Sequence, residues 1–363
     1  MNQVVINLAR EMEKSSSYDP IVLICDWAAV NPIWEEIHGI KTLRWRIRPL
    51  TEKMNLKERF LYKVWESRFR AKFKQLCLER NIKVINPHYP GSATLTLERV
   101  VRSLEKPIPM ILSFHGNDLS SIKKVGEIGL SQWKALLSRG QKIVVCSSDL
   151  GRKVKNIFGE NVNLHVVHNG LDVPSFVATA ASIPRSTQRN ILSVAKFEHK
   201  KGQDILVSAF AAIADDYRDV ILILVGASDR ALKGLQDLCV EKRIAEKVLF
   251  FPDVPHHQVA GFFKNATIFV LPSRTEPFGI VILEAGAFSL PVVASRTGGV
   301  TEILTDGLTG RIVEAENITE LEECLRSMLD CAGPAKDMGA RLKKHICSNF
   351  TWTAAHQKYI ALI

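Results

Sequence analysis

In the second half of the chain, short apolar runs alternate with stretches whose apolar residues recur at helical spacing. The apolar runs predict strands at 190–193, 220–225, 247–251, 268–271 and 291–294. The helical patterns lie between them, at 202–215, 229–242, 257–264 and 279–288. Such regular alternation is typical of a parallel sheet that is covered by helices on both faces.

The first half alternates less regularly. Its apolar runs predict strands at 21–25, 82–87, 108–114, 142–146 and 164–167, and a long helix is expected at 53–80. Periodicity is lost at 173–189, which we interpret as a linker. The expected organisation is therefore an α/β chain with one doubly wound domain at 1–172, a second at 190–345 and a C-terminal helix at 346–363 that packs back toward the first domain.

Composition limits the class of protein. A length of 363 residues suffices for two ordinary domains, and 46% hydrophobic residues indicates a globular chain. No apolar run reaches the ~18 residues of a membrane-spanning helix, and the N-terminus lacks a signal-peptide pattern. The seven cysteines include no C-x-x-C pair, which favours buried, reduced thiols and a cytoplasmic location.

The net charge of +10 is confined to the first half. Up to Asp172 there are 27 Lys and Arg against 17 Asp and Glu, a difference of +10, whereas from Val173 onward there are 21 of each. Residues 41–75 hold much of the excess, interleaved with aromatic residues. This composition fits a helix that lies on an anionic membrane surface. It fits equally a core-facing aromatic stripe with a solvated basic face. No nucleic-acid-binding motif accompanies the charge, so a nucleic-acid partner is not expected.

Two glutamates eight positions apart, Glu276 and Glu284, bracket the start of a predicted helix. Gly279 lets the chain turn after the strand at 268–271, so that Glu276 stands in the turn and Glu284 about one turn into the helix. The free N–H groups at such a helix start form a seat for phosphate. A carboxylate on either side of that seat suits a ligand with hydroxyl groups at both ends, such as a nucleotide-diphosphate sugar.

The stretch Leu271-Pro-Ser-Arg-Thr-Glu-Pro-Phe-Gly-Ile-Val-Ile-Leu-Glu-Ala-Gly-Ala, followed by Pro291-Val-Val-Ala-Ser and Thr297-Gly-Gly-Val-Thr-Glu, resembles the E-x7-E region of retaining family 4 glycosyltransferases. The resemblance implies a GT-B fold, in which two Rossmann-like domains face a central cleft. It also implies that Glu276 binds hydroxyls of the donor sugar and Glu284 binds the ribose. The family's donor diphosphate would then rest on the backbone near Phe278, Gly279, Ile280 and Val281.

Further positions carry over from the resemblance. The family has an arginine and then a lysine on the donor diphosphate, and Lys196 and Lys201 stand at these places. Lys196 keeps the charge of the arginine but loses its two-pronged geometry. His115 matches a histidine near the donor sugar, and Gly226 lies where the nucleotide base is expected. Glu276, His115 and Lys201 are therefore the expected catalytic residues.

Two glycine-containing turns have expected roles of their own. The sequence His168-Asn169-Gly170 resembles the turn with which the family leaves the first domain, and an Asn-Gly pair favours an unusual backbone turn. The glycines at 298–299 permit a close backbone approach and line the donor site, or serve a plain turn. The family's opening strand and glycine-rich loop have no counterpart here, because residues 4–12 already follow helical spacing.

The resemblance implies a retaining glycosyltransferase that moves a hexosyl group from a nucleotide-diphosphate sugar to a glycan, expected to be lipid-linked, in bacterial surface polysaccharide assembly. No cofactor or metal is expected, since the chain has no D-x-D pair and no metal-spaced Cys/His cluster. The protein would rest on the inner membrane face. Two alternatives remain open: a GT-B-type nucleotide-sugar epimerase, and a truncated donor-binding protein without catalysis.

Overall fold

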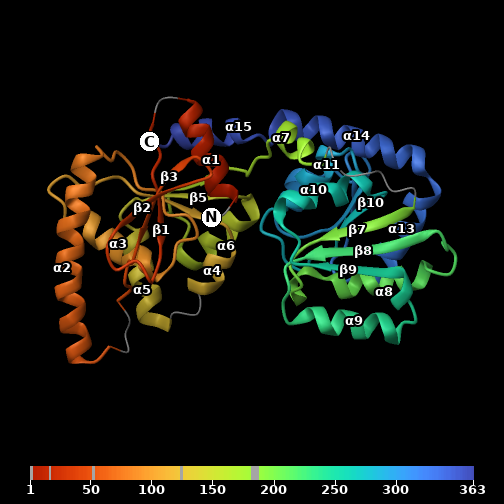
Figure 1. The fold of residues 1–363 in the computed structure, drawn as a ribbon, viewed down its shortest axis with the longest axis horizontal. Coiled ribbons are helices and arrows are strands. Elements are labelled where there is room, and N and C mark those ends of the chain that lie inside the picture. The colour runs from red at the N-terminus through yellow and green to blue at the C-terminus, as the bar shows by residue number, and fades with distance from the viewer. Residues whose placement is uncertain (1–2, 16–17, 51–53, 123–125, 181–187) are drawn as a thin grey trace. The chain divides into compact units, whose positions relative to one another are not determined.

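A computed structural model of the protein describes residues 3–15, 18–50, 54–122, 126–180 and 188–363. The chain forms two compact units (Figure 1). Unit 1 comprises Met1–His168 together with Ala355–Ile363, and unit 2 comprises Asn169–Ala354. The first unit thus ends at His168, where the sequence had suggested 172, and the last nine residues return to it.

Unit 2 contains a six-stranded sheet in the order β12-β11-β10-β7-β8-β9, and all neighbouring strands are parallel. Five of these strands lie where the apolar runs predicted them; β12 was not predicted. The order reverses between β7 and β10, as in a doubly wound fold. The strands are β7 (Arg189–Val194), β8 (Val220–Gly226), β9 (Val248–Pro252), β10 (Ile268–Leu271), β11 (Val292–Ser295) and β12 (Arg311–Val313).

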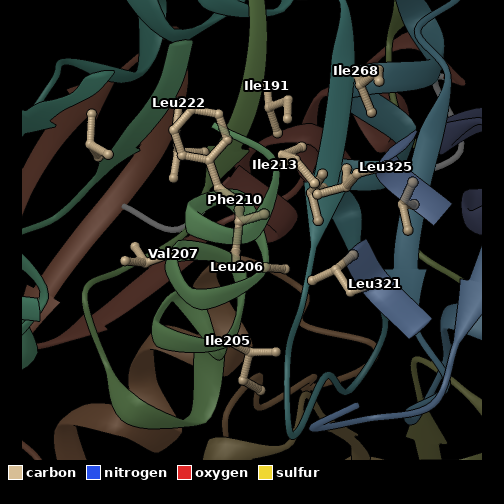
Figure 2. Close-up of a cluster of buried hydrophobic side chains, with 14 of the residues drawn as sticks. Ile191, Ile205, Leu206, Val207, Phe210, Ile213, Leu222, Ile268, Leu321 and Leu325 are labelled. Atoms are coloured by element: carbon tan, nitrogen blue, oxygen red, sulfur yellow. The ribbon is translucent and has the colours of Figure 1, made fainter. Parts of the chain in front are cut away.

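Helices pack against this sheet in two groups. Helix α8 contacts α9 and α13, while α11 contacts α7, α10 and α14. The first group encloses a core of fully buried side chains that includes Phe210 of α8, Leu222 of β8 and Leu325 of α13 (Figure 2). The helices of unit 2 are α7 (Val173–Ala178), α8 (Gln203–Ile213), α9 (Ala231–Glu241), α10 (His256–Asn265), α11 (Ile280–Ala287), α12 (Val300–Ile303), α13 (Ile318–Asp330) and α14 (Ala332–Asn349), with 3-10 turns η1 (His199–Lys201) and η2 (Ala245–Lys247).

Unit 1 contains two three-stranded sheets, in the orders β1-β3-β2 and β4-β5-β6. The second is parallel, whereas β2 and β3 form an antiparallel hairpin beside the parallel pair β1 and β3. Each strand of unit 1 is short. The strands are β1 (Val22–Cys25), β2 (Ile33–Ile37), β3 (Ile40–Trp45), β4 (Ile111–Phe114), β5 (Lys142–Val145) and β6 (Leu164–Val166).

The β2–β3 hairpin was not predicted from the sequence. Its strands meet at His38 and Gly39, which both have positive φ, the geometry of a tight hairpin turn. The predicted strand at 82–87 was also wrong. Only isolated bridges form there, between Ile85 and Met110 and between His88 and Ser113, and Pro87, which lies between the two bridges, has no backbone N–H to donate.

The basic segment 41–75 divides between β3 and helix α2, and positions 51–53 lie outside the described residues. The ring centroid of Trp45 lies 4.6 Å from that of Phe69 and 6.3 Å from that of Phe73 of α2, with tilted ring planes, and all three residues are buried. The buried aromatic residues Phe69 and Phe73 therefore face the core, whereas Phe60, near the start of α2, is 67% exposed and most basic residues of α2 face solvent. The helices of unit 1 are α1 (Gln3–Lys14), α2 (Leu56–Glu79), α3 (Ser92–Arg102), α4 (Asn117–Ile122), α5 (Gly126–Leu137) and α6 (Ser148–Phe158), together with α15 (Trp352–Ile360) from Ala355 onward.

Two expectations for the connecting segments need correction. Residues 173–178 of the expected linker form helix α7, capped by the side chain of Asp172 with Pro174 in the first turn, while 181–187 lie outside the described residues. The expected boundary at 345 falls inside α14. Beyond it, the part of α15 from Ala355 onward belongs to unit 1, where the Tyr359 hydroxyl lies 2.9 Å from Ser113 Oγ of β4.

The seven cysteines are all free thiols. Four of them are buried, as expected, but Cys25, Cys331 and Cys347 are exposed. The expectation of buried thiols therefore holds for four cysteines and fails for the other three.

Candidate functional site

The carboxyl ends of β7 and β10 lie side by side in unit 2, because these strands are neighbours at the point where the strand order reverses. The loop after β7 carries Lys196 and Lys201, and the loop after β10 carries Glu276. In a doubly wound sheet this position is the usual place for a ligand. The topology thus brings together residues that lie 75 positions apart in the sequence.

The central contact of the site is an ion pair between Lys201 and Glu276. Lys201 Nζ lies 2.7 Å from Glu276 Oε2, and the two side chains are only 18% and 10% exposed. The loops that carry them are bonded directly, since the Lys200 carbonyl accepts from the N–H groups of Arg274 and Thr275. A buried pair of this kind holds both groups in fixed positions.

The glycine turn after β11 is in close contact with the backbone of Glu276. Gly298 has a φ of +53°, and a Cβ atom placed on it would lie 1.7 Å from the Glu276 carbonyl oxygen. The N–H of Gly299 donates to that same oxygen at 3.2 Å. The expected close backbone approach at 298–299 is therefore present, and its partner is Glu276.

Helix α11 begins directly after Gly279, whose φ of +104° makes the turn that the sequence predicted. The N–H groups of Ile280 and Val281, in the first turn, find no acceptor among the described residues. These free donors and the positive end of the helix dipole suit a phosphate group. The ring of Phe278 instead packs in the core, 6.0 Å from that of Phe350, so only its backbone faces the turn.

Glu284 lies in α11 and is nearly buried, with an exposed fraction of 9% for its side chain. Its nearest charged partner is His256 of α10, whose Nε2 lies 3.6 Å from Glu284 Oε1. The hydrogen bond to Glu284 raises the pKa of His256 above its ordinary value of 6.5, against the opposing effect of burial. The helix thus holds Glu284 one turn beyond the phosphate seat, with a titratable neighbour.

Lys196 has a different environment from Lys201. Its Nζ lies 2.5 Å from Glu198 and 2.6 Å from Asp229, and its side chain is 48% exposed. The hydrogen bonds to Asp229 and Glu198 raise the pKa of Lys196. Two carboxylates already balance this charge, so its assignment to the diphosphate stays a prediction. Gly226 ends β8 against the Ala195 carbonyl, and its assignment to the nucleotide base also stays a prediction.

His115, at the end of β4, belongs to unit 1. The buried carboxylate of Asp118 accepts from the N–H groups of His115, Gly116 and Leu119, which fixes the turn. His115 Nε2 lies 3.0 Å from His88 Nδ1, and burial lowers the pKa of both histidines, that of His88 to about 4. His115 is therefore a neutral imidazole at ordinary pH.

One ring nitrogen of His115 remains for another partner. Its Nδ1 is buried and has no hydrogen-bond partner among the described residues. The Tyr89 ring stacks on the imidazole at 4.2 Å and holds its plane. A neutral, oriented imidazole with one free nitrogen can exchange a hydrogen bond with a sugar hydroxyl.

The expected role of the Asn169–Gly170 pair was wrong. Neither residue has a positive φ, so the pair does not make an unusual turn. Gly170 is needed for space instead, because a Cβ there would lie 2.3 Å from the backbone between Thr351 and Trp352. Leu171 donates to the Phe350 carbonyl beside this contact.

Several side chains that contact the candidate residues within each unit were missed by sequence reasoning. Arg274 bonds both carboxylate oxygens of Asp204 at 2.8 Å and so anchors the loop that carries Glu276. His256, His88 and Tyr89 were missed as well. The only sequence signal for Arg274 was its place inside the quoted motif, while the histidines meet their partners through the tertiary fold.

Within the described parts of the chain, no group of three or more His, Cys, Asp and Glu residues is arranged to hold a metal ion. Positive charge near Glu276 comes from Lys201 and from the start of α11.

Two family profiles match almost the whole chain. Residues 1–174 match Glycosyltransferase Family 4, and residues 179–345 match Glycosyl transferases group 1. Among curated proteins, glycogen synthase of Mycobacterium tuberculosis (strain CDC 1551 / Oshkosh) is 27% identical over 231 residues, which are 62% of this chain and 55% of that protein. D-inositol 3-phosphate glycosyltransferase of Mycobacterium bovis (strain BCG / Pasteur 1173P2) is 28% identical over 242 residues, 64% of this chain and 48% of that protein. The matches thus span about half the length of these relatives.

Solved structures of similar fold extend over the full chain. Sucrose-phosphate synthase from Thermosynechococcus elongatus has a TM-score of 0.75 at 21% identity and covers 99% of this chain and 91% of its own. The Anabaena protein HepE, solved in complex with UDP and glucose, has a TM-score of 0.74 at 16% identity, with coverage of 99% and 95%. These likenesses confirm the α/β fold of the GT-B class. By its two profiles, the chain belongs to the group 1 glycosyl transferases of family 4.

Proposed function

We propose that the protein is a retaining, metal-independent glycosyltransferase that moves a hexosyl group from a nucleotide-diphosphate sugar to a hydroxyl of a glycan. The observation that supports this most is the buried pair of Lys201 and Glu276 beside the start of α11. The pair joins a cation for the diphosphate to a carboxylate for the sugar. Glu284, one turn further on, serves the ribose.

The leaving group sets the main electrostatic demand on the site. As the bond between the anomeric carbon and the phosphate oxygen breaks, negative charge develops on the nucleoside diphosphate. Preorganised donors at that oxygen lower the barrier. Lys201 has three N–H donors, of which one points to Glu276, so the others remain for phosphate oxygens. The N–H groups of Ile280 and Val281 add two more.

Retention follows if the acceptor attacks from the face that the leaving group vacates. A bond then forms between the acceptor hydroxyl oxygen and the anomeric carbon, and the hydroxyl proton passes to the departing phosphate oxygen. No protein base is needed for this transfer. Glu276 would hold the sugar hydroxyls during the step, and His115 would hydrogen-bond the donor sugar or shape the acceptor side.

The acceptor that we propose is a lipid-linked glycan of a bacterial surface polysaccharide, reached at the inner membrane face. The first turns of α2 expose Leu56, Phe60, Leu61 and Val64, and the helix also exposes basic side chains. An apolar strip among basic residues favours an anionic lipid surface. Within the described residues, no helix is long and apolar enough to span a bilayer, so attachment through α2 would be peripheral. The basic exposed residues of α2 are Lys57, Arg59, Lys63, Arg68, Arg70 and Lys72.

Vesicle binding tests the membrane part of the proposal. The double variant Phe60→Ser/Leu61→Ser should lose sedimentation with phosphatidylglycerol vesicles while keeping its fold. Leu78→Ser is the matched control, because Leu78 is 71% exposed at the other end of the same helix. Equal binding of the wild type to neutral phosphatidylcholine vesicles, or no loss in the double variant, would refute attachment through this strip.

Turnover tests the reaction itself. The protein is incubated with UDP-, GDP- and ADP-sugars and a membrane extract as acceptor, and release of nucleoside diphosphate and the anomeric configuration of the product are measured. Glu276→Gln should abolish transfer, whereas Glu241→Gln, an exposed glutamate at the end of α9, should not. Transfer by Glu276→Gln at the wild-type rate would contradict the assignment of Glu276 to the donor sugar. Conversion of the donor to its epimer without an acceptor would favour an epimerase instead.

A further inference from the structure

A chain of hydrogen-bonded side chains runs through unit 1 from helix α15 to His115. The Tyr359 hydroxyl lies 2.9 Å from Ser113 Oγ, and Ser113 Oγ lies 2.8 Å from Asn86 Oδ1. Asn86 Nδ2 lies 3.1 Å from His88 Nε2, and His88 Nδ1 lies 3.0 Å from His115 Nε2. Each inner member has a partner on both sides, so the position of its protons depends on its neighbours.

The two hydroxyl groups at one end give this chain its direction. Ser113 is fully buried and Tyr359 is 5% exposed. Among the described residues, the hydrogen-bonding neighbours of the Tyr359 hydroxyl are Ser113 and Asn86. Burial raises the pKa of Tyr359, so the phenol keeps its proton and needs an acceptor. Both hydroxyl protons are satisfied if Tyr359 donates to Ser113 Oγ and Ser113 donates to Asn86 Oδ1.

The opposite orientation of the Asn86 amide leaves a proton without an acceptor. With Nδ2 turned toward the hydroxyls, the amide would add donors to a group that already holds two hydroxyl protons. Ser113 and Tyr359 cannot each donate to the other at the same time. A buried donor without an acceptor is costly. Asn86 therefore presents Oδ1 to Ser113 and Nδ2 to His88.

The orientation of Asn86 determines the tautomers of both histidines. Burial lowers the pKa of His88 to about 4 and that of His115 well below its ordinary value, so each ring is neutral and carries one proton. His88 Nε2 accepts from the Asn86 amide, which leaves the ring proton on Nδ1. His88 donates that proton to His115 Nε2, which must be unprotonated. The proton of His115 is therefore on Nδ1.

We propose that the hydrogen-bonded chain beginning at Tyr359 fixes His115 as a hydrogen-bond donor at Nδ1. Asn86, Ser113 and Tyr359 are then positioning residues, which act on a ligand only through the two histidines. His115 Nδ1 is buried and has no partner among the described residues, so its N–H is available to a ligand. The ligand atom opposite is an acceptor, such as the oxygen of a sugar hydroxyl.

A protonated Nδ1 excludes one chemical role for His115. This nitrogen has no lone pair with which to take a proton from an acceptor hydroxyl, so it cannot serve as a general base there. His115 would bind and orient a sugar oxygen, while the hydroxyl proton passes to the departing phosphate oxygen. This role rests on the proposed function, whereas the tautomer is a property of the protein alone.

Nitrogen-15 NMR of the ligand-free protein near neutral pH tests the tautomer directly. Long-range proton–nitrogen correlation spectra separate a protonated ring nitrogen from an unprotonated one. The signals that vanish in His115→Gln belong to His115. We expect a protonated Nδ1 and an unprotonated Nε2 in the wild type. A protonated Nε2, or protonation of both nitrogens, would overturn the proposal without the need for another variant.

A double variant tests whether the hydroxyl groups set the tautomer. Ser113→Ala/Tyr359→Phe removes both hydroxyl protons and leaves the amide and the two imidazole rings in place. Either orientation of the Asn86 amide is then open, and we expect a mixture of the two His115 tautomers. The wild-type tautomer in this double variant would overturn the positioning role.

The matched control is Ser138→Ala/Tyr217→Phe. It removes two hydroxyls that donate outside this chain, to the Ala135 carbonyl and to Asp330, and it should keep the wild-type tautomer. A nucleotide sugar that raises the thermal midpoint should also shift the Nδ1–H resonance of His115. Binding without that shift would overturn the contact of His115 with the donor sugar. Failure of every nucleotide sugar to bind would contradict the proposed function and leave the tautomer result standing.

Discussion

Lys201 Nζ and Glu276 Oε2 lie 2.7 Å apart, although 75 positions separate them in the sequence. Each comes from the loop at the carboxyl end of its strand, and the strand order makes the two loops neighbours. The pair is largely withdrawn from solvent, so each group depends on the other for its charge balance.

Replacement of Gly298 by alanine should damage the site through Glu276. The new Cβ would overlap the Glu276 carbonyl, and alanine would have to adopt a positive φ. We expect a loss of at least about 2 kcal/mol of unfolding free energy, together with loss of nucleotide-sugar binding. Urea unfolding and calorimetric titration measure the two effects.

Gly234→Ala in α9 is the control, because its Cβ meets no atom within 4 Å. Its free energy of unfolding should rise by about 0.5–1 kcal/mol. Similar outcomes for both variants would contradict the contact.

The ion pair of His256 and Glu284 should make stability depend on pH. The pKa of His256 is raised in the folded protein, so the contribution is fully present below pH 6.5 and is lost as the pH rises through the folded pKa. His256→Gln should therefore lower the thermal midpoint at pH 5.5 more than at pH 8.5. His257→Gln, at the adjacent exposed position, should show no such difference. A His256 effect that is independent of pH would contradict the pairing.

The buried histidines of unit 1 should act in the opposite direction. Burial lowers the pKa of His88 to about 4, so its contribution is present above pH 6.5 and is lost as the pH falls toward 4. His88→Gln should flatten the decline of unit 1 stability between pH 6.5 and 4, and His165→Gln, near the surface, should leave it unchanged. An NMR titration in which the His88 ring protonates near its ordinary pKa would disprove the burial effect.

Chelation should leave sugar transfer unaffected. In the proposed mechanism Lys201 and the first turn of α11 neutralise the leaving diphosphate, so removal of divalent cations by EDTA should not change the rate. Lys201→Ala should lower it by about 100-fold or more, the range seen when one electrostatic donor is removed. Transfer that requires added Mg²⁺ or Mn²⁺ would contradict the metal-independent reaction.

The sequence predicted best where local pattern and tertiary structure agree. The run at 268–271 is buried throughout in a parallel sheet, and β10 has the predicted bounds. The turn at Gly279 likewise follows from one residue. The β2–β3 hairpin was missed because β2 is mostly solvent-exposed, so its residues do not form the apolar run from which the buried strands were predicted.

The contacts between side chains could not be predicted in the same way. The contacts of Lys201 with Glu276 and of His88 with His115 depend on which strands are neighbours in each sheet. Strand order cannot be read directly from one sequence. The role of Gly170 changed for the same reason, because the chain that requires its small size lies at 351–352.

The most direct test of the central claim is the thermal midpoint of the protein with UDP-, GDP- and ADP-sugars, measured for the wild type and for Glu284→Gln. A ligand that binds only the folded state raises the midpoint by mass action. We expect a rise with one nucleotide class in the wild type, and a clearly smaller rise in the variant because the ribose contact is lost. No rise with any nucleotide sugar, or an equal rise in both proteins, would contradict a donor site at β7, β10 and α11.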